Sequence, residues 1–157
     1  MKLRNIVVDD AIVTRLEGTK RNEVLAELMD SLVKAGAVAE DHRESLLDGV
    51  IKREKRGTTG FGHGVAVPHV KTPDVDSLKV AIGISDSGID FKAFDKEPVH
   101  SIFLLISPED RPEEHIDAME AIFARLSKDQ FRRFLRQAEN AGDVLTLIEE
   151  ADAVQSG

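Results

Sequence analysis

The chain has 157 residues, of which 41% are hydrophobic, so it is long enough to form one domain with its own core. Its formal net charge of −8 argues against a nucleic-acid partner, which needs a basic surface, and the absence of cysteine excludes disulfides, thiolate metal sites and a cysteine nucleophile. No apolar run approaches the ~20 residues of a membrane-spanning helix and residues 1–10 do not resemble a signal peptide, so the sequence predicts a cytoplasmic protein without membrane insertion.

The first part of the chain is predicted to contain an extended segment and a helix. Residues 6–16 favour an extended start. Thr19 is expected to cap a helix that runs to about Ala35, and Gly36 closes it. Apolar residues at helical spacing mark the buried face of this helix, namely Val24, Leu25, Leu28, Leu32 and Val33.

A second helix is predicted to lead into a glycine-rich loop. Asp41 and Glu44 have the spacing of a capping box, with Asp in place of the usual Ser or Thr, and Gly57 ends the helix. The last turn of this helix is basic and contains Lys52, Arg53, Lys55 and Arg56. Cations are favourable at a helix C-terminus. The helix therefore delivers positive charge to the loop, although a solvated helix end explains the same pattern.

Residues 57–69, with the sequence GTTGFGHGVAVPH, are the most informative segment. Glycine gives the backbone freedom and allows close approach to other groups. Residues 65–67 are predicted to form a short strand, and Pro68 restricts the backbone around it. We therefore expect His69 to emerge at the end of a strand on a stiff backbone, as an aimed imidazole requires.

The second half of the chain interleaves strands with helices, which predicts an α/β domain. Residues 71–77 are interpreted as a polar connection, residues 78–84 as a strand and residues 86–88 as a turn. A further strand is predicted at residues 98–106. Its apolar run, residues 102–106, is expected to be central and buried on both faces.

Three helices are predicted after a loop at residues 107–112. Apolar spacing marks the buried face of the first helix, which contains Ile116, Met119, Ile122, Phe123 and Leu126. The second is marked by Phe131, Phe134 and Leu135, and the third by Val144, Leu145, Leu147 and Ile148 after a cap at Asp143. Residues 153–157 are expected to be a frayed tail, which leaves residues 1–152 as the domain.

Five histidines carry the candidate chemistry. His42, in the first turn of a surface helix, is expected to face solvent, and His100, at the start of the buried strand, is expected to lie at the edge of the core. His63 lies in the glycine-rich loop, where an exposed side chain is the default. His69 and His115 each follow a predicted strand, and ligands bind at strand ends in open α/β sheets. We therefore expect these two rings to meet.

Cationic and donor side chains are expected beside this pair, in an arrangement that suits a phosphoryl group. They are Arg53, Arg56, Thr58 and Thr59. A neutral imidazole is a good nucleophile near neutral pH, and arginine stabilises charge on phosphoryl oxygens. Because the sequence has no Walker motif and no acidic magnesium cluster, we expect that, if the site handles phosphate, it carries it covalently on His69 and not as a nucleotide complex, without a cofactor or metal.

Arg53-Glu54 and residues 59–69 together resemble the signature of the fructose/mannitol-type IIA domains of the bacterial phosphoenolpyruvate-dependent sugar phosphotransferase system. This group includes the nitrogen-regulatory IIA proteins. The resemblance covers nearly the whole chain, including residues 102–108 and His115. It implies a single α/β domain in which α-helices flank both sides of a mixed β-sheet.

The resemblance also implies a phosphotransferase that works as a stoichiometric phosphocarrier. The family histidine matching His69 accepts a phosphoryl group from a phosphohistidine on a small carrier protein of the HPr or NPr type. It then passes the group to a IIB domain, or holds it as a regulatory mark for a target protein. His115 and Arg53 match family residues that assist, and Thr59 and His63 are candidate phosphoryl contacts. His63 stands where relatives often carry Asn or an acid.

Other interpretations stay open. A free-standing IIA protein can serve sugar transport or regulation, and the Thr-Gly-Phe-Gly loop with the N-terminal extension favours regulation. A pure interaction protein would use the surface around His69 without transfer chemistry. A metal-dependent hydrolase would use His63, His69 and His115 as ligands, but the sequence has no HExxH motif.

Overall fold

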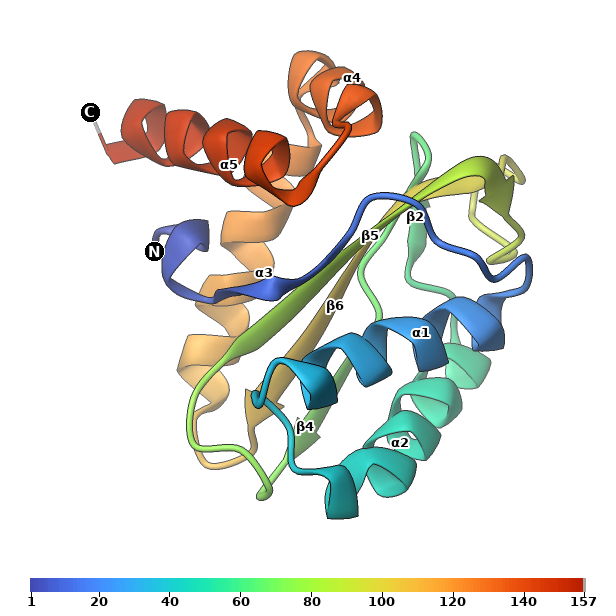
Figure 1. Ribbon diagram of the computed structural model, residues 1–157, viewed down its shortest axis with the longest axis vertical. Helices are drawn as coiled ribbons and strands as arrows, with labels where there is room; N and C mark the ends of the chain where they lie inside the picture. The colour runs from blue at the N-terminus through green and yellow to red at the C-terminus, as the bar shows by residue number, and fades with distance from the viewer. Residues whose placement is uncertain (157) are drawn as a thin grey trace.

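A six-stranded mixed β-sheet with helices on both faces forms the frame of the protein in a computed structural model, which describes the backbone of residues 1–156 (Figure 1). The strands are β1 (Val7–Val13), β2 (Gly60–Gly62), β3 (Val65–Ala66), β4 (His69–Thr72), β5 (Lys79–Ile89) and β6 (Val99–Pro108). The helices are η1 (Leu3–Asn5), α1 (Arg21–Lys34), η2 (Glu40–His42), α2 (Arg43–Arg56), α3 (Pro112–Leu126), α4 (Asp129–Gln137) and α5 (Ala141–Ser156). The predicted α/β fold is confirmed.

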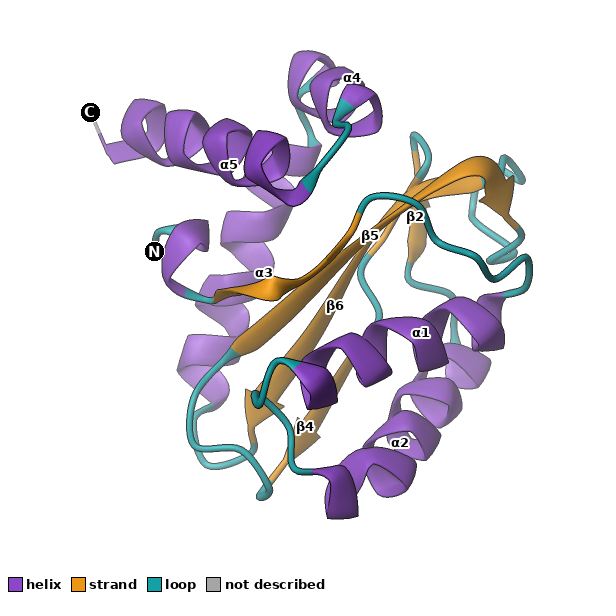
Figure 2. Cartoon of the chain, viewed as in Figure 1, coloured by secondary structure: helices purple, strands orange, loops and turns teal. Residues whose placement is uncertain are grey.

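The strand order is β1–β5–β6–β3–β2, with β4 also paired to β6 (Figure 2). β5 and β6 are antiparallel, β1 is parallel to β5, and both β3 and β4 are parallel to β6. β3 places Val65 opposite Ser101, and β4 places His69 opposite Leu105. β3 and β4 therefore follow each other along one edge of β6, interrupted at Pro68.

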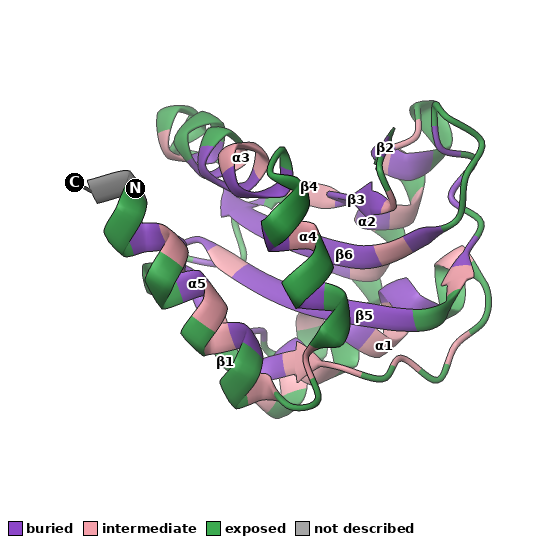
Figure 3. Ribbon diagram, turned by 90° about the horizontal axis from the view of Figure 1, so that it is seen from above, coloured by how far each residue is buried: buried purple, intermediate pink, exposed green. Residues whose placement is uncertain are grey.

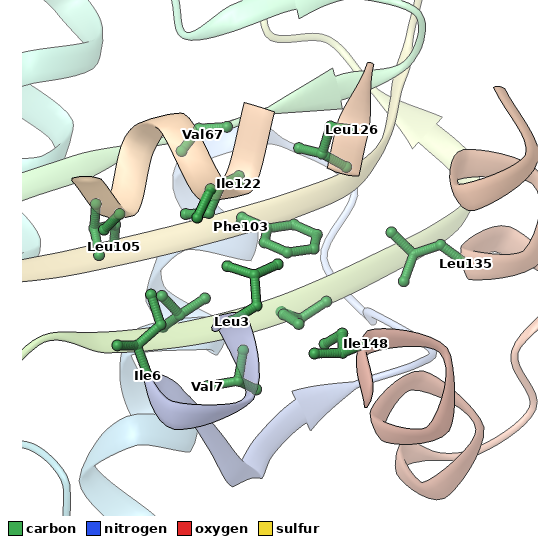
Figure 4. Close-up of a cluster of buried hydrophobic side chains, with 14 of the residues drawn as sticks. Leu3, Ile6, Val7, Val67, Phe103, Leu105, Ile122, Leu126, Leu135 and Ile148 are labelled. Carbon is green, nitrogen blue, oxygen red and sulfur yellow. The ribbon is translucent and has the colours of Figure 1, made fainter. Parts of the chain in front are cut away.

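The sheet separates two hydrophobic cores. α1 and α2 cover one face, and α3, α4 and α5 with η1 cover the other, which is shown in close-up in Figure 4. Side chains of β6 alternate between the two cores, with Phe103 and Leu105 on the α3 side and Leu104 and Ile106 on the α1 side. These residues are fully buried, and most of β6 has the buried colour in Figure 3. The prediction of a central strand buried on both faces is confirmed.

The strand boundaries near the glycine-rich loop differ from the prediction. His69 begins β4 rather than following the end of a strand, and residues 71–72, expected in a polar connection, belong to the same strand. Residues 86–88 continue β5 rather than forming a turn, with a register shift against β6 between Ile84 and Ile89. Both differences arise from pairing with β6, which is distant in sequence from β4 and invisible to local patterns.

The N-terminal ends of α1 and α2 are capped differently from the prediction. Thr19 does not cap α1, because the helix begins at Arg21 and its N-cap residue is Lys20; the Glu23 carboxylate turns back and accepts the backbone N–H groups of Thr19 (3.0 Å) and Lys20 (3.2 Å). The predicted capping box of Asp41 and Glu44 is absent, since the short turn η2 precedes α2 directly and α2 has no side-chain cap.

The predicted cap of α5 is also wrong. The helix begins at Ala141, and the Asn140 side chain accepts the backbone N–H of Asp143 at 3.0 Å. At the other end, α5 extends through Ser156, so the expected frayed tail is helical to that point, and Gly157 lies outside the described residues. Within residues 1–156 no helix combines the length and the apolar character needed to cross a membrane.

The buried face of α3 is rotated relative to its apolar pattern. Ile116, predicted to be buried, is 55% exposed, whereas its neighbour His115 is buried together with Ala118, Ile122 and Arg125. One residue corresponds to ~100° around a helix, which is enough to exchange an apolar for a polar side chain at the sheet. The rotation directs His115 towards the sheet.

Candidate functional site

His69 lies at the start of β4, directly after Pro68, and its ring is half-buried. Its Nδ1 is 2.9 Å from the carbonyl oxygen of Val67. Because a carbonyl oxygen only accepts hydrogen bonds, Nδ1 carries the proton in the neutral ring and Nε2 keeps its lone pair. Burial lowers the pKa of His69, and so do the charges of Arg53 and Lys71, against the opposing effect of the Val67 hydrogen bond. His69 is therefore a neutral imidazole with a free Nε2 near neutral pH.

His115 is buried in the first turn of α3, beside His69. The two ring centroids are 5.3 Å apart, with the ring planes at 59°. The Nδ1 of His115 is 2.7 Å from the hydroxyl oxygen of Ser107, at the end of β6. Burial, with smaller effects from His69 and Lys71, lowers the pKa of His115 to about 4. The expectation that these two rings meet is fulfilled, and both are neutral near neutral pH.

Arg53, on the last turn of α2, supplies positive charge near His69. Its Nη1 donates to the carbonyl oxygen of Gly57 at 2.9 Å, and its charge lies close enough to lower the pKa of His69. The next residue, Glu54, is buried and accepts hydrogen bonds from both the backbone N–H and the hydroxyl of Thr59. The Glu54 carboxylate therefore ties the C-terminus of α2 to the start of the glycine-rich loop.

The two threonines of the loop serve its structure in this state. Thr59 is fully buried and its hydroxyl donates to Glu54, while the Thr58 hydroxyl donates to the carbonyl oxygen of Phe91 at 2.6 Å. Both hydroxyl hydrogens are thus already used inside the protein. Arg56 is exposed at the end of α2. Of the predicted set, Arg53 is the side chain whose charge acts on His69.

Comparison with known proteins decides the family. The model of the family described as "Phosphoenolpyruvate-dependent sugar phosphotransferase system, EIIA 2" matches residues 5–151. The chain belongs to this family.

The relatives of this IIA chain include both regulatory and transport proteins. A nitrogen regulatory protein of Bradyrhizobium diazoefficiens is 32% identical over 149 residues, which cover 94% of the IIA chain and 95% of that protein. A fructose-specific EIIABC component of Bacillus subtilis is 28% identical across 97% of the IIA chain, which spans only 24% of that longer protein. The crystal structure of the nitrogen regulatory protein IIA-Ntr from Neisseria meningitidis superposes with a TM-score of 0.84 at 25% identity, covering 93% of this chain and 98% of that one. The predicted family is confirmed.

His63 does not lie beside the histidine pair of the IIA chain. It occupies the turn between β2 and β3 with a φ of 58°, where its backbone N–H donates to the Asp95 carboxylate at 3.0 Å. The register along β6 puts Val65 four residues before His69. At ~3.3 Å per residue this is roughly 13 Å, and His63 lies further still. The backbones of β3 and β4 therefore lie apart along β6, and contact of His63 with a phosphoryl group on His69 stays a prediction.

The other two histidines have separate contacts. The Nδ1 of His100 is 2.8 Å from the carbonyl oxygen of Ser85, and His42 is 3.8 Å from the Asp74 carboxylate. Among the described residues, no group of three or more His, Cys, Asp or Glu side chains is arranged to hold a metal ion.

Ser107 is the contact of the site that the sequence interpretation missed, because residues 107–112 were expected to form a loop. The structure extends β6 through Pro108, and Ser107 is completely buried there. The sequence feature that could have identified Ser107 is its position. It is a polar residue directly after an apolar strand and lies eight residues before His115.

The lowered pKa of His115 makes the stability of the IIA chain depend on pH. An unfolded histidine titrates near pKa ~6.5, whereas folding moves that of His115 to about 4. The unfolded chain therefore binds more protons between these values, so this contribution is complete above the unfolded pKa and is lost as pH falls. We expect the free energy of unfolding to fall by about 1–3 kcal/mol from this cause across the window, after allowance for solvent screening.

Urea denaturation across that pH range measures this effect, with His115→Gln as the reference because it removes the titrating ring. As the pH falls from the upper to the lower end of the window, the wild type should lose about 1–3 kcal/mol more of its free energy of unfolding than the variant loses. Parallel pH profiles would show that His115 does not titrate with a lowered pKa.

Proposed function

We propose that this IIA chain is a cytoplasmic phosphocarrier that accepts a phosphoryl group on Nε2 of His69 from a phosphohistidine of an HPr-type carrier protein. The bond between phosphorus and nitrogen in the donor breaks, its electron pair returns to the donor imidazole, and a new bond forms to Nε2 of His69. The observation that supports this most directly is the hydrogen bond from Nδ1 of His69 to the Val67 carbonyl, because it leaves Nε2 unprotonated. Throughout the transfer the proton stays on Nδ1 of His69, where it is donated to the Val67 carbonyl oxygen.

The surroundings of His69 are proposed to stabilise the phosphoryl oxygens. The His115 ring lies 5.3 Å away between centroids, within reach of a group bonded to Nε2. Arg53 provides a permanent positive charge near the His69 ring. Transfer of a phosphoryl group needs little beyond positioning and charge stabilisation. His69, His115 and Arg53 supply these functions without a metal or cofactor.

Incubation with phosphoenolpyruvate, enzyme I and an HPr-type carrier tests this proposal. We expect one acid-labile phosphate per chain, located on His69 by mass spectrometry. A folded chain that takes up no phosphate would support the pure interaction protein instead.

Regulation is the proposed use of the phosphate, and sugar transport is the alternative. The interpretation as a regulatory protein is supported by two nitrogen regulatory relatives, which this chain matches over almost their full length. The interpretation as a transport protein is supported by the fructose-specific relative, of which the chain spans 24%. The phosphorylated chain can be offered to a purified fructose- or mannitol-type IIB domain. Rapid transfer would favour transport, whereas retention of the phosphate would favour a regulatory mark.

Replacement of His115 is expected to slow phosphoryl acceptance without abolishing it. His115→Ala removes a hydrogen-bond donor to a charged oxygen, which is worth about 1.5–3 kcal/mol, so acceptance should slow by about 10- to 100-fold. The phosphorylated form should also hydrolyse faster. Rapid-quench kinetics with labelled carrier measure both effects, and His42→Ala controls for loss of an imidazole far from the site. Equal rates in the two variants would mean that His115 is only structural.

A further inference from the structure

Ser107 joins His115 to the strand that also positions His69. On β6, Leu105 lies opposite His69 and Ser107 lies opposite Lys71. Leu105 and Ser107 are two residues apart and therefore point to the same face of the sheet, which is the face covered by α3. The Ser107 hydroxyl is fully buried and lies 2.7 Å from Nδ1 of His115. The strand β6 thus positions both histidines, His69 through its pairing with β4 and His115 through the Ser107 side chain.

The direction of this hydrogen bond follows from the surroundings of the hydroxyl. Within the part of the chain that the structure describes, the Nδ1 of His115 is the sole hydrogen-bond partner of the Ser107 side chain. If Nδ1 carried the proton, the hydroxyl hydrogen would be buried without an acceptor, which costs free energy. The serine hydroxyl therefore donates and Nδ1 of His115 accepts. In a neutral ring the proton then sits on Nε2.

We infer that Ser107 is a positioning residue that holds His115 in the tautomer protonated on Nε2, so that His115 donates a hydrogen bond to the phosphoryl group on His69. This inference rests on the proposed function. The two rings then have opposite tautomers, because the Val67 carbonyl fixes the proton on Nδ1 of His69 and the Ser107 hydroxyl fixes the proton on Nε2 of His115. One ring then presents a lone pair and its neighbour presents a donor.

The tautomers can be read directly from nitrogen-15 chemical shifts of labelled histidine in the unphosphorylated full chain, near neutral pH. In the wild type we expect the shift of a protonated Nε2 for His115 and of a protonated Nδ1 for His69. Ser107→Ala removes the donor to Nδ1, so His115 should move to a mixture of tautomers while His69 is unchanged. Ser107→Thr keeps the hydroxyl and should keep the wild-type tautomer. Thermal unfolding checks that each variant is folded.

The same variants are then compared in phosphoryl acceptance from an HPr-type carrier. We expect Ser107→Ala to slow acceptance by about 3- to 30-fold, in proportion to the loss of one oriented hydrogen bond, and Ser107→Thr to restore most of the rate. If the threonine variant does not fold, the comparison of alanine with wild type decides alone.

The outcomes separate this inference from the proposed function. An unchanged His115 tautomer in Ser107→Ala, or a changed tautomer with an unchanged acceptance rate, would overturn the role of Ser107. A wild-type protein that accepts no phosphate on His69 would overturn the proposed function, and with it the catalytic purpose of Ser107. The tautomer spectrum of that same protein would still show whether the hydroxyl controls His115.

Discussion

His69→Ala is expected to accept no phosphoryl group above background from a phosphorylated HPr-type carrier. The substitution removes the Nε2 lone pair, and none of the other four histidines takes its place. His115 is closest but is buried and, in our inference, protonated on Nε2. His63 lies in the turn before β3, and His42 and His100 have contacts elsewhere.

The fold should survive this change. His69 is half-buried, and within the described residues its side chain makes one hydrogen bond, to Val67, whose net contribution is about 0.5–1.5 kcal/mol. Circular dichroism and urea denaturation of the variant should therefore resemble the wild type. His42→Ala is the matched control and should incorporate phosphate normally. Acid-labile incorporation that persists in folded His69→Ala would move the acceptor to another side chain and end the present assignment.

The elements predicted best were those whose burial is indicated by a local run or spacing of apolar residues. The apolar run at residues 102–106 predicted β6 as a central strand, because a strand buried on both faces has no polar alternation. The segment containing β4 was interpreted as a connection, because its exposed Lys71 and the absence of an apolar pattern resemble a loop. Pairing with β6 makes it a strand, and long-range pairing leaves no local signature.

The rotation of α3 shows why the apolar pattern failed there. The pattern placed Ile116 inside, but two polar residues, His115 and Arg125, occupy the buried face. Each has a specific polar partner, which are Ser107 and Asp152 respectively. A hydrophobic pattern cannot foresee buried polar residues, because their burial depends on partners elsewhere in the chain.

The proximity of the two candidate rings was predicted from the sequence, whereas the rest of the site geometry was predicted only in part. Proline followed by histidine after a glycine-rich loop identified His69, and position after the central strand identified His115. The distance between His63 and His69 depends on the register of β3 and β4 against β6, which the local sequence does not reveal. The same register explains how Ser107, expected in a loop, becomes a buried contact of His115.

Asp152→Ala is expected to destabilise the protein by about 3–5 kcal/mol, a large part of the ~5–15 kcal/mol that stabilises a typical domain. Asp152 is buried in α5, and its carboxylate accepts from Nη2 of Arg125 at 2.7 Å. It also accepts the backbone N–H groups of Leu3 (3.0 Å) and Arg4 (2.9 Å). One carboxylate therefore joins the N-terminal turn, α3 and α5. Its removal leaves a buried guanidinium charge and two N–H groups without this acceptor.

Urea denaturation with a double-mutant cycle measures this contribution. Arg125→Met alone should also destabilise the chain, because it leaves the carboxylate buried without its cation. The double variant should recover part of the loss, since a buried charge is costly mainly when its partner is missing. Asp9→Ala, which breaks the exposed 2.6 Å pair with Arg4, is the control and should cost no more than about 1 kcal/mol. If Asp152→Ala cost no more than Asp9→Ala, the junction of η1, α3 and α5 would depend on apolar packing alone.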